Sequence, residues 1–184
     1  MIFAPGEVHG SFVIDQQRRA DDRGFFARFW CENEFAKQGI DYKVVQMNLG
    51  RSIRAGTVRG MHLQNYPHLE AKVACCTRGA IFDVAVDLRP SSPTFRKWFG
   101  VELTAENGRM LYVPAGCAHG YQTLEDDTDM LYLTTAAYAP AAATGVRFDD
   151  PAFAIHWPRP VSVISDADRK WPAYETAGHV RVEP

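Results

Sequence analysis

The chain has 184 residues, enough for one ordinary domain that buries a sizeable core. Hydrophobic residues make up 46% and charged residues 23%, a composition that excludes an intrinsically disordered protein. Lys and Arg total 20 against 22 Asp and Glu, so the chain lacks the basic excess that draws proteins to nucleic acid or acidic membranes. We therefore expect neither nucleic acid nor membrane as a partner.

The cysteines and the apolar runs bear on the compartment. Cys31, Cys75, Cys76 and Cys117 show no CxxC spacing and include an adjacent pair, which is typical of neither a zinc site nor a disulfide framework. The first residues lack the basic stretch and apolar run of a signal peptide. The longest uncharged run, 130–146, is too polar to span a bilayer. We expect a reduced, cytoplasmic protein.

Gly and Pro interrupt a series of short apolar segments, and no long stretch with a 3.6-residue period occurs. In chain order, strands are expected at 8–14, 24–30, 43–49, 72–78, 80–88, 96–103, 109–113 and 129–135. Short helices or turns are expected at 33–38 and 166–170. Many short strands at this spacing favour a sandwich or barrel. We predict one all-β domain over 1–184, with the tail from Trp157 packed over the barrel.

Three polar residues, His62, Lys72 and Asp83, lie in or next to apolar strand-like segments. In a small barrel, such groups line a ligand cavity or pair with one another. A hairpin at Gly79 would bring Lys72 and Asp83 into contact, and a plain structural ion pair remains an open interpretation of that contact. Residue types alone do not decide between the two.

Histidines offer candidates for catalysis or metal binding. His62 lies in RGMHLQ and His119 in VPAGCAHGYQ, after turn residues, and each can also be an ordinary hydrogen-bonded histidine. His68 and Glu70 add further ligand types, but there is no His-x-His pair and the spacing forces no three ligands together. We therefore expect no metal.

Two early segments combine cations, amides and an aromatic ring. Such residues can grip a phosphate and stack a base, although surface charge and core packing explain each one separately. The residues are Arg23, Phe26, Gln46, Asn48 and Arg59. Tyr132 and Tyr138 are likewise read as core or rim aromatics when each is taken alone.

Taken in chain order, seven segments resemble the dTDP-4-dehydrorhamnose 3,5-epimerase family. They are DDRGFFARF (21–29), QMNLGRSIRAGTVRGMHLQ (46–64), KVACCTRGAIFDVAVDLRPSSPTF (72–95), VPAGCAHGYQTL (113–124), MLYLTTAAYAP (130–140), DDPAFAIHWP (149–158) and ISDAD (164–168). The combination of RGxHxQ, GxIxDVxVDLRxxSPTF and PxGxAHGxQ is specific. The resemblance implies a cupin-like jelly roll, a homodimer, a nucleotide-sugar substrate and no metal or other cofactor.

The resemblance also implies residue roles. His62 matches the family's general base, and Asp168 the carboxylate that orients it. Lys72 matches the lysine that stabilises an enolate, and Tyr132 the tyrosine that returns a proton from the opposite face. His119 matches a histidine lining the site. The five early residues match positions that hold the nucleotide and pyrophosphate, and we place Arg28 and Tyr138 with them as substrate-binding residues.

These residue types suit the chemistry of a 4-keto-6-deoxy sugar. Both C3 and C5 neighbour the C4 carbonyl, so removing either proton gives an enolate whose charge moves to the C4 oxygen. Free imidazole titrates near neutral pH, where general-base catalysis works best. A lysine cation can stabilise the developing oxyanion. Inversion then requires a second proton donor on the other face of the sugar.

Two departures from the family pattern and two alternative functions stay open, and a third alternative does not. The family commonly has an acidic residue where this chain has Arg28, so the nucleotide base is less certain than the chemistry. Glu70 lies two residues before Lys72, where it could tune the lysine. The chain could instead epimerise only C3 of another nucleotide sugar, could bind nucleotide sugars without catalysis, or could be a metal-dependent cupin. The last alternative fails for lack of clustered ligands.

Overall fold

Two six-stranded sheets form the body of the protein in the computed structural model, which describes the backbone of residues 1–184 and all side chains except those of 176 and 177. The first sheet has the order β1 (Ile2–Pro5), β2 (Phe12–Asp15), β10 (Arg109–Val113), β7 (Lys72–Arg78), β12 (Thr128–Thr134) and β5 (Gln46–Ser52). The second has the order β13 (Ala143–Gly145), β6 (Thr57–Gln64), β11 (Cys117–Thr123), β8 (Ala80–Asp87) and β9 (Trp98–Thr104), with β14 (Val163–Ile164) paired to β6.

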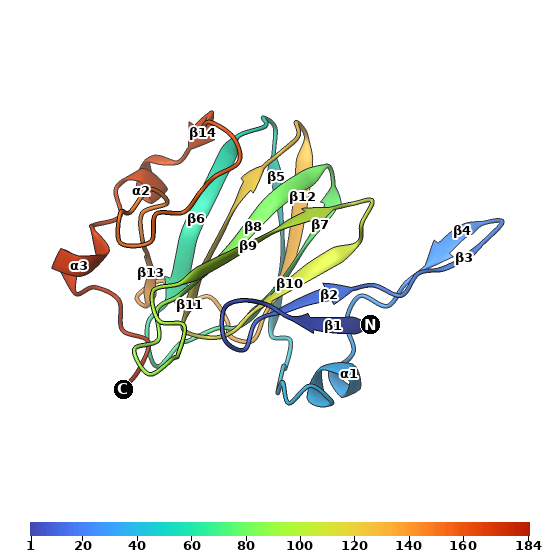
Figure 1. The fold of residues 1–184 in the computed structure, drawn as a ribbon, viewed down its shortest axis with the longest axis horizontal. Coiled ribbons are helices and arrows are strands. Elements are labelled where there is room, and N and C mark those ends of the chain that lie inside the picture. Colours follow the sequence, from blue (N-terminus) through green and yellow to red (C-terminus); the bar gives the residue numbers. More distant parts are fainter.

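From β5 onward the chain passes back and forth between the two sheets, and Figure 1 shows them facing each other. This crossing pattern is that of a cupin-like jelly roll. The expected all-β fold is therefore confirmed. Strand alternation explains the layers, because the side chains of one face enter the space between the sheets.

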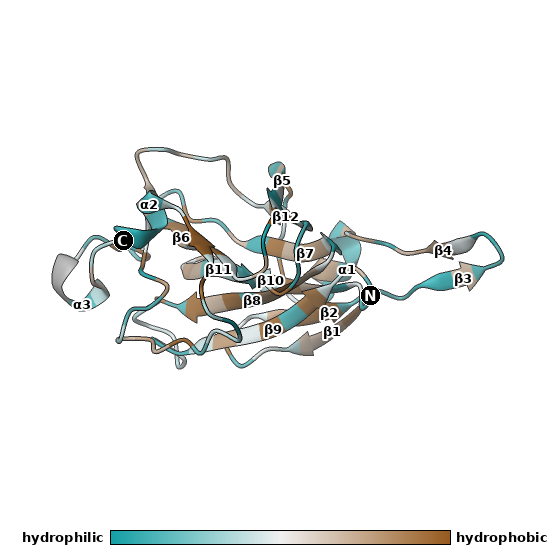
Figure 2. Cartoon of the chain, turned by 90° about the horizontal axis from the view of Figure 1, so that it is seen from above, coloured by the Kyte–Doolittle hydropathy of each residue, from teal (hydrophilic) through white to brown (hydrophobic). Residues whose placement is uncertain are grey.

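A hydrophobic core fills most of that space. Ala74, Cys76, Ile81 and Ala85 belong to one buried cluster between the sheets, while Val84 lies in another cluster on the opposite face of β8. Figure 2 shows the apolar residues concentrated in the central strands. Both faces of β7 and β8 are buried, so their sequences are nearly continuous apolar runs. A polar side chain on such a strand must find a partner or line a cavity.

The expected strands at 72–78, 80–88, 96–103, 109–113 and 129–135 match observed strands to within two residues at each end. Three others begin or end elsewhere: the strand expected at 8–14 starts at Phe12, that at 24–30 ends at Phe26, and that at 43–49 spans Gln46–Ser52. β6 was not expected, because Gly60 and several polar residues interrupt its apolar pattern.

Three short helices lie around the sheets. They are α1 (Glu32–Ala36), α2 (Asp166–Arg169) and α3 (Tyr174–Ala177). The first two match the expected helical segments, and the third was not expected. The C-terminal tail packs against the second sheet as expected, since β14 runs parallel to β6 and α2 contacts it. Among the described residues, no helix has the length and apolar character needed to cross a membrane.

The hairpin of β3 (Arg19–Asp21) and β4 (Gly24–Phe26) projects away from both sheets, as Figures 1 and 2 show. Its strands pair with each other and all six of their residues are exposed. The aromatic rings of Phe25 and Phe26 are 57% and 69% exposed. An isolated two-stranded hairpin is marginally stable in water, so its exposed aromatics need an explanation.

Candidate active site

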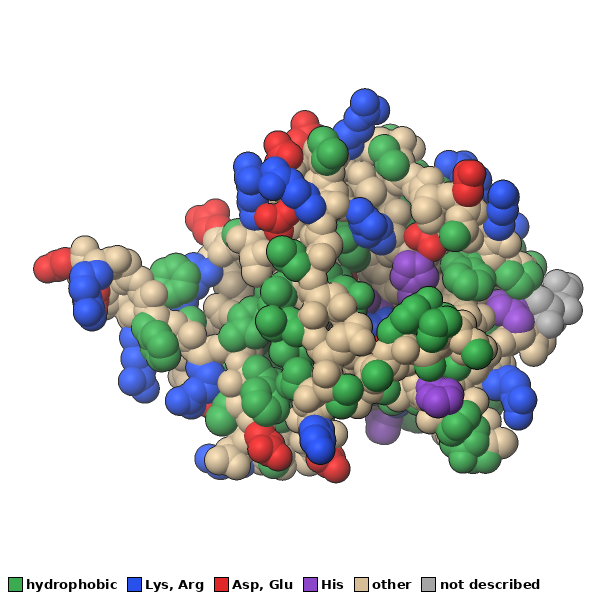
Figure 3. Space-filling view, turned by 180° about the vertical axis from the view of Figure 1, so that it is seen from behind, with side chains coloured by type: hydrophobic (Ala, Val, Ile, Leu, Met, Phe, Trp, Pro, Cys, Tyr) green, Lys and Arg blue, Asp and Glu red, His purple; other side chains and the backbone are tan. Residues whose placement is uncertain are grey.

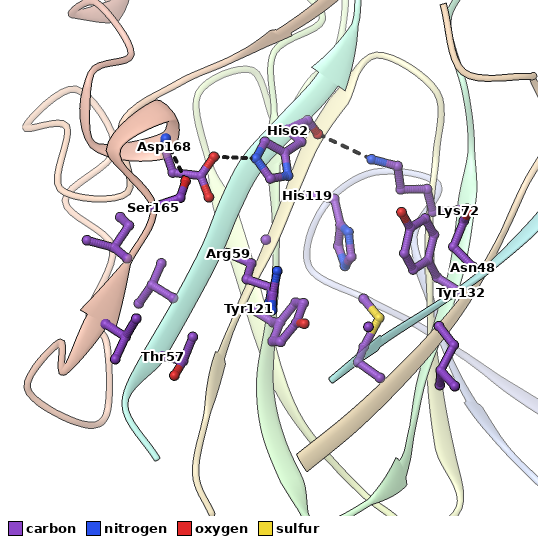
Figure 4. Close-up of a pocket in the computed structure, with 17 residues that line it drawn as sticks. Asn48, Thr57, Arg59, His62, Lys72, His119, Tyr121, Tyr132, Ser165 and Asp168 are labelled. Carbon is purple, nitrogen blue, oxygen red and sulfur yellow. Dashed lines mark hydrogen bonds and ion pairs between the residues drawn. The ribbon is translucent and has the colours of Figure 1, made fainter. Parts of the chain in front are cut away.

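A cavity of about 660 Å³ opens between the two sheets. Seven of the sequence-predicted site residues line it: Asn48, Arg59, His62, Lys72, His119, Tyr132 and Asp168. Figure 4 shows His62 and Asp168 on one side, Lys72 and Tyr132 on the other, and His119 between them. In the space-filling view, a histidine side chain lies at the edge of a recess (Figure 3). The fold thus brings together residues that are far apart in the sequence.

His62 and Asp168 form a close pair. The Nε2 atom of His62 lies 2.6 Å from Oδ1 of Asp168, with the Asp168 side chain 8% exposed and that of His62 45% exposed. A carboxylate only accepts hydrogen bonds, so Nε2 carries the proton and donates it, which leaves Nδ1 able to accept a proton. The pair therefore holds a histidine in the form of a base.

Two contacts that sequence reasoning missed hold Asp168. Its Oδ2 accepts the backbone N–H of Gly60 at 3.2 Å, and its own N–H donates to Oγ of Ser165 at 3.0 Å. Ser165 is the N-cap of α2, and a serine before DADR is a recognisable helix start. Burial acts to raise the pKa of Asp168, but the hydrogen bonds and charge of His62 and the Gly60 N–H outweigh it and hold that pKa below its usual value.

Gly60 lets β6 and β11 approach closely beside the pair. It has φ +123°, and a Cβ there would lie 2.6 Å from the Gly120 Cα and 2.8 Å from the His119 carbonyl oxygen. His62 and His119 lie directly opposite each other on these strands, and the register shifts just after His119. Glycine is therefore required at position 60 for β6 to approach β11 this closely.

The expected pairing of Lys72 with Asp83 is wrong. The chain crosses from the first sheet to the second at Gly79, so β7 and β8 do not form a hairpin. Lys72 instead pairs with Glu70, with Nζ 3.0 Å from Oε1, and Nζ also lies 3.4 Å from the carbonyl oxygen of His62. Asp83 pairs with His119, whose Nε2 lies 2.8 Å from Oδ1, and both side chains are almost fully buried.

Tyr132 lies on β12, across the cavity from β6. Its neighbours on the flanking strands are Asn48 and Ala74. Burial raises the pKa of Tyr132, the negative charge of Glu70 adds to that effect, and Arg59 opposes it. A phenol with a raised pKa keeps its proton at neutral pH and can donate it.

The predicted nucleotide-binding residues fall into two groups. Gln46 and Asn48 are joined by a 2.9 Å hydrogen bond, and the backbone N–H of the exposed Tyr138 donates to Oε1 of Gln46 at 3.2 Å. Arg59 lies further along the cavity, where its Nε donates to Oγ of Ser52 at 3.1 Å. Asn48 and Arg59 line the cavity, and Gln46 and Tyr138 adjoin Asn48 outside its lining. We call these four residues the polar margin.

The structure does not place Arg23, Phe26 and Arg28 at this cavity of the same chain. Arg23 lies at the turn of the projecting hairpin, where its side chain is 89% exposed and pairs with Asp21. Arg28 pairs with Glu34 at 2.6 Å beside a small separate hollow that Phe26 also lines. The two strands of the hairpin pair with each other and project from the body of the protein. Within one chain, Arg23, Phe26 and Arg28 are therefore separated from the other candidate site residues.

Further cavity residues were not singled out from the sequence. Thr57 and Tyr121 line the wall, and burial raises the pKa of the Tyr121 phenol. No pattern in the sequence distinguishes them from core residues. Among the side chains described, no group of three or more His, Cys, Asp or Glu is placed to hold a metal ion.

A base held by a carboxylate, with a phenol and an ammonium group facing it, is the equipment for moving protons on a bound molecule. The protein is therefore a jelly-roll enzyme of the acid–base class. The family model described as dTDP-4-dehydrorhamnose 3,5-epimerase matches residues 5–176, and the chain belongs to this family.

Individual relatives agree over nearly the whole length. A dTDP-4-dehydrorhamnose 3,5-epimerase from Sinorhizobium fredii is 44% identical over 162 residues, 88% of this chain and 83% of that protein. The structure of a 3,5-epimerase from Legionella pneumophila in complex with dTDP-4-keto-L-rhamnose has a TM-score of 0.92 at 31% identity and covers 100% of this chain and 98% of its own. A 3′-monoepimerase from Streptomyces bikiniensis in complex with dTDP-quinovose has a TM-score of 0.88 at 33% identity, covering 97% and 92%.

Proposed function

We propose that this enzyme epimerises C3 and C5 of a dTDP-linked 4-keto-6-deoxy sugar, converting dTDP-4-dehydro-6-deoxyglucose to dTDP-4-dehydrorhamnose. The observation that carries this proposal is the position of His62 on β6 and Tyr132 on β12, in facing sheets on either side of one cavity. Inversion at carbon needs a base on one face of the sugar and an acid on the other. The ligands of the Legionella and Streptomyces relatives support a dTDP sugar.

The proposed reaction uses side chains alone. Nδ1 of His62 removes the proton from C3 or C5, and the electron pair of the C–H bond moves into the enolate and onto the C4 oxygen. The Lys72 ammonium stabilises that oxyanion, and the Tyr132 phenol then protonates the same carbon from the opposite face. Solvent afterwards reprotonates Tyr132 and takes the proton from His62, so the enzyme returns to its starting state.

We assign the nucleotide and diphosphate to the polar margin of Gln46, Asn48, Arg59 and Tyr138. An exposed tyrosine ring can stack on a base, and an arginine fork can bind phosphate oxygens. The Arg28–Glu34 pair already satisfies part of the Arg28 guanidinium, which makes a direct reading of the base by Arg28 less favourable within one chain.

We also propose a homodimer in which the hairpin of one copy enters the cavity of the other. Arg23 and Phe26 can hold the nucleotide only if a second chain supplies them, because their own chain holds them away from its cavity. The edge strand β5 carries the exposed Met47 (63%) and Leu49 (66%), which a partner would cover. Figure 3 shows hydrophobic side chains between the hairpin and the recess.

We also propose a compartment and a biological setting. All four cysteines are free and three are buried, which supports a reducing compartment such as the cytoplasm. Residues 1–184 are proposed to act as one domain in deoxysugar biosynthesis.

The proposal is tested by incubating the protein with dTDP-, CDP- and GDP-linked 4-keto-6-deoxy sugars and identifying the products by NMR. We expect turnover of the dTDP sugar with inversion at C3 and C5. Inversion at C3 alone would make the protein a monoepimerase like the Streptomyces bikiniensis relative. Binding without turnover of any of the three sugars would contradict an enzymatic role and favour a binding protein.

A further inference from the structure

Glu70 contacts Lys72 from outside the cavity. It precedes β7, its side chain is 13% exposed, and its Oε1 lies 3.0 Å from Nζ of Lys72, which is 8% exposed. Lys72 lines the cavity, whereas Glu70 does not. Two charges withdrawn from water to this extent are costly unless they are well paired, so the contact constrains both side chains.

The Lys72 ammonium has two close polar neighbours in the protein. Nζ donates a hydrogen bond to the carbonyl oxygen of His62 at 3.4 Å and forms an ion pair with Oε1 of Glu70 at 3.0 Å. These are the Nζ contacts found among the described residues. An ammonium has three N–H donors, so this one hydrogen bond leaves donors for a ligand in the cavity that Lys72 lines. The ion pair with Glu70 holds Nζ beside that cavity.

The other charged and titratable groups around this part of the cavity come from the elements packed against β7. They are Arg59 and His62 on β6, His119 and Tyr121 on β11, Tyr132 on β12 and Asp168 on α2. Asp168 is already bound to His62. Within the described part of the chain, Glu70 is the carboxylate within ion-pair distance of Lys72.

We propose that Glu70 is a positioning residue, whose carboxylate holds the Lys72 ammonium at the cavity. The inference rests on the proposed epimerase function, in which Lys72 stabilises the enolate. Glu70 also favours the protonated phenol, because its charge raises the pKa of Tyr132 in addition to the effect of burial. The phenol therefore stays in the protonated form that the reaction needs as the pH rises.

The test is the pH profile of kcat/KM for wild type, Glu70→Gln and a control, Glu106→Gln. Glutamine keeps the size and an acceptor oxygen but removes the charge, and Glu106 is an exposed residue outside the cavity. We expect the basic limb of Glu70→Gln to lie about one pH unit lower than in wild type, a roughly tenfold loss of kcat/KM at alkaline pH. Glu106→Gln should follow the wild-type profile.

Two further variants separate the effect of Glu70 on Lys72 from its effect on Tyr132. In the Tyr132→Phe background, Glu70→Gln should still lower the rate of deuterium exchange into the sugar, because the Lys72 ammonium is then no longer held in place to stabilise the enolate. Glu70→Asp keeps the charge and should retain the wild-type limb. If Glu70→Gln does not fold, Glu70→Ala takes its place in both comparisons.

The outcomes are distinct for this inference and for the proposed function. An unchanged basic limb in a folded, active Glu70→Gln variant, or an exchange rate that Glu70→Gln leaves unchanged in the Tyr132→Phe background, overturns the role of Glu70 alone. Failure of the wild-type protein to exchange or epimerise any nucleotide sugar overturns the proposed function and this inference with it.

Discussion

His62 and Asp168 are separated by 106 positions, yet their side chains meet at 2.6 Å. The contact depends on backbone as much as on side chains, because Gly60 donates to the same carboxylate and Ser165 caps the helix that carries it. A histidine held in this way keeps one tautomer and one orientation. At the scale of single residues, we therefore assign the role of general base to His62 and the role of orienting that base to Asp168.

The role of Asp168 can be measured separately. Asp168→Asn keeps the shape of the side chain but removes the negative charge that favours Nε2–H. We expect the rate of deuterium exchange into the sugar to fall, but by less than in His62→Ala, with a general base contributing about 10²- to 10⁴-fold. An Asp168→Asn variant that exchanges as fast as wild type would show that the pair is structural.

Tyr132 should separate deprotonation from inversion. In Tyr132→Phe the enolate still forms at His62, but no phenol returns a proton to the opposite face. Deuterium should enter the sugar with retained configuration, while the rate of inversion falls by about 10²-fold or more. NMR of the recovered sugar measures both quantities. Equal loss of exchange and inversion would instead mean that Tyr132 acts on the enolate itself or only shapes the pocket.

At the scale of elements, strands in which apolar and polar residues clearly alternate can be predicted from the sequence. The sheet to which each of these strands belongs cannot. The sequence of 80–88 shows its two faces, but nothing in it reveals that Gly79 leads from one sheet to the other. For that reason the sequence offers both Asp83 and Glu70 as neighbours of Lys72, and the structure pairs the lysine with Glu70. β6 was missed because Gly60 interrupts it, although that glycine is needed to approach β11 and Asp168.

The residues that converge on the cavity were predicted from family motifs and not from spacing. His62, Lys72, Tyr132 and Asp168 lie on four different elements, so only the fold brings them together. A local signal existed for Ser165, a serine that precedes a short acidic helix. No signal in the sequence indicated that the hairpin would hold Arg23 and Phe26 away from the cavity.

The end of β8 offers a test of stability at this scale. Asp87 is fully buried and accepts hydrogen bonds from Arg89, Ser92 and Thr94, which tie the loop after β8 to the sheet. Burial acts to raise the pKa of Asp87, but these donors outweigh it and lower that pKa to about 2. The carboxylate thus stabilises the fold above about pH 4, and this contribution is lost as the pH falls toward 2.

Asp87→Asn should therefore lower the free energy of unfolding by about 2 kcal/mol at pH 7, and by less at pH 3. Urea unfolding at both pH values measures the difference. Asp149→Asn is a matched control, because Asp149 also pairs with an arginine two residues away, Arg147, but at the surface. It should cost less than about 1 kcal/mol. Equal losses in the two variants, or a loss at Asp87 that does not shrink at low pH, would contradict this reasoning.

At the scale of the whole molecule, the proposed homodimer joins the exposed hairpin of one chain to the cavity of the other. A mixture of two inactive variants tests this directly. His62→Ala lacks the base, and the double variant Arg23→Ala with Phe26→Ala lacks the hairpin contacts. In a heterodimer of the two, one site combines an intact His62 with the intact hairpin of the partner.

Co-refolding equal amounts of the two variants should restore about a quarter of wild-type activity, since half of the dimers are mixed and each has one intact site. The control is each variant refolded alone. No recovery from mixed dimers, or a protein that sediments as a single chain, would contradict the shared site.

The central claim is that His62 removes a proton from carbon next to the C4 carbonyl. NMR of dTDP-4-dehydro-6-deoxyglucose incubated with enzyme in deuterated water measures it most directly. We expect wild type to incorporate deuterium at C3 and C5 and His62→Ala to incorporate it at neither. Deuterium entering either position in His62→Ala at a rate near that of wild type would contradict the claim.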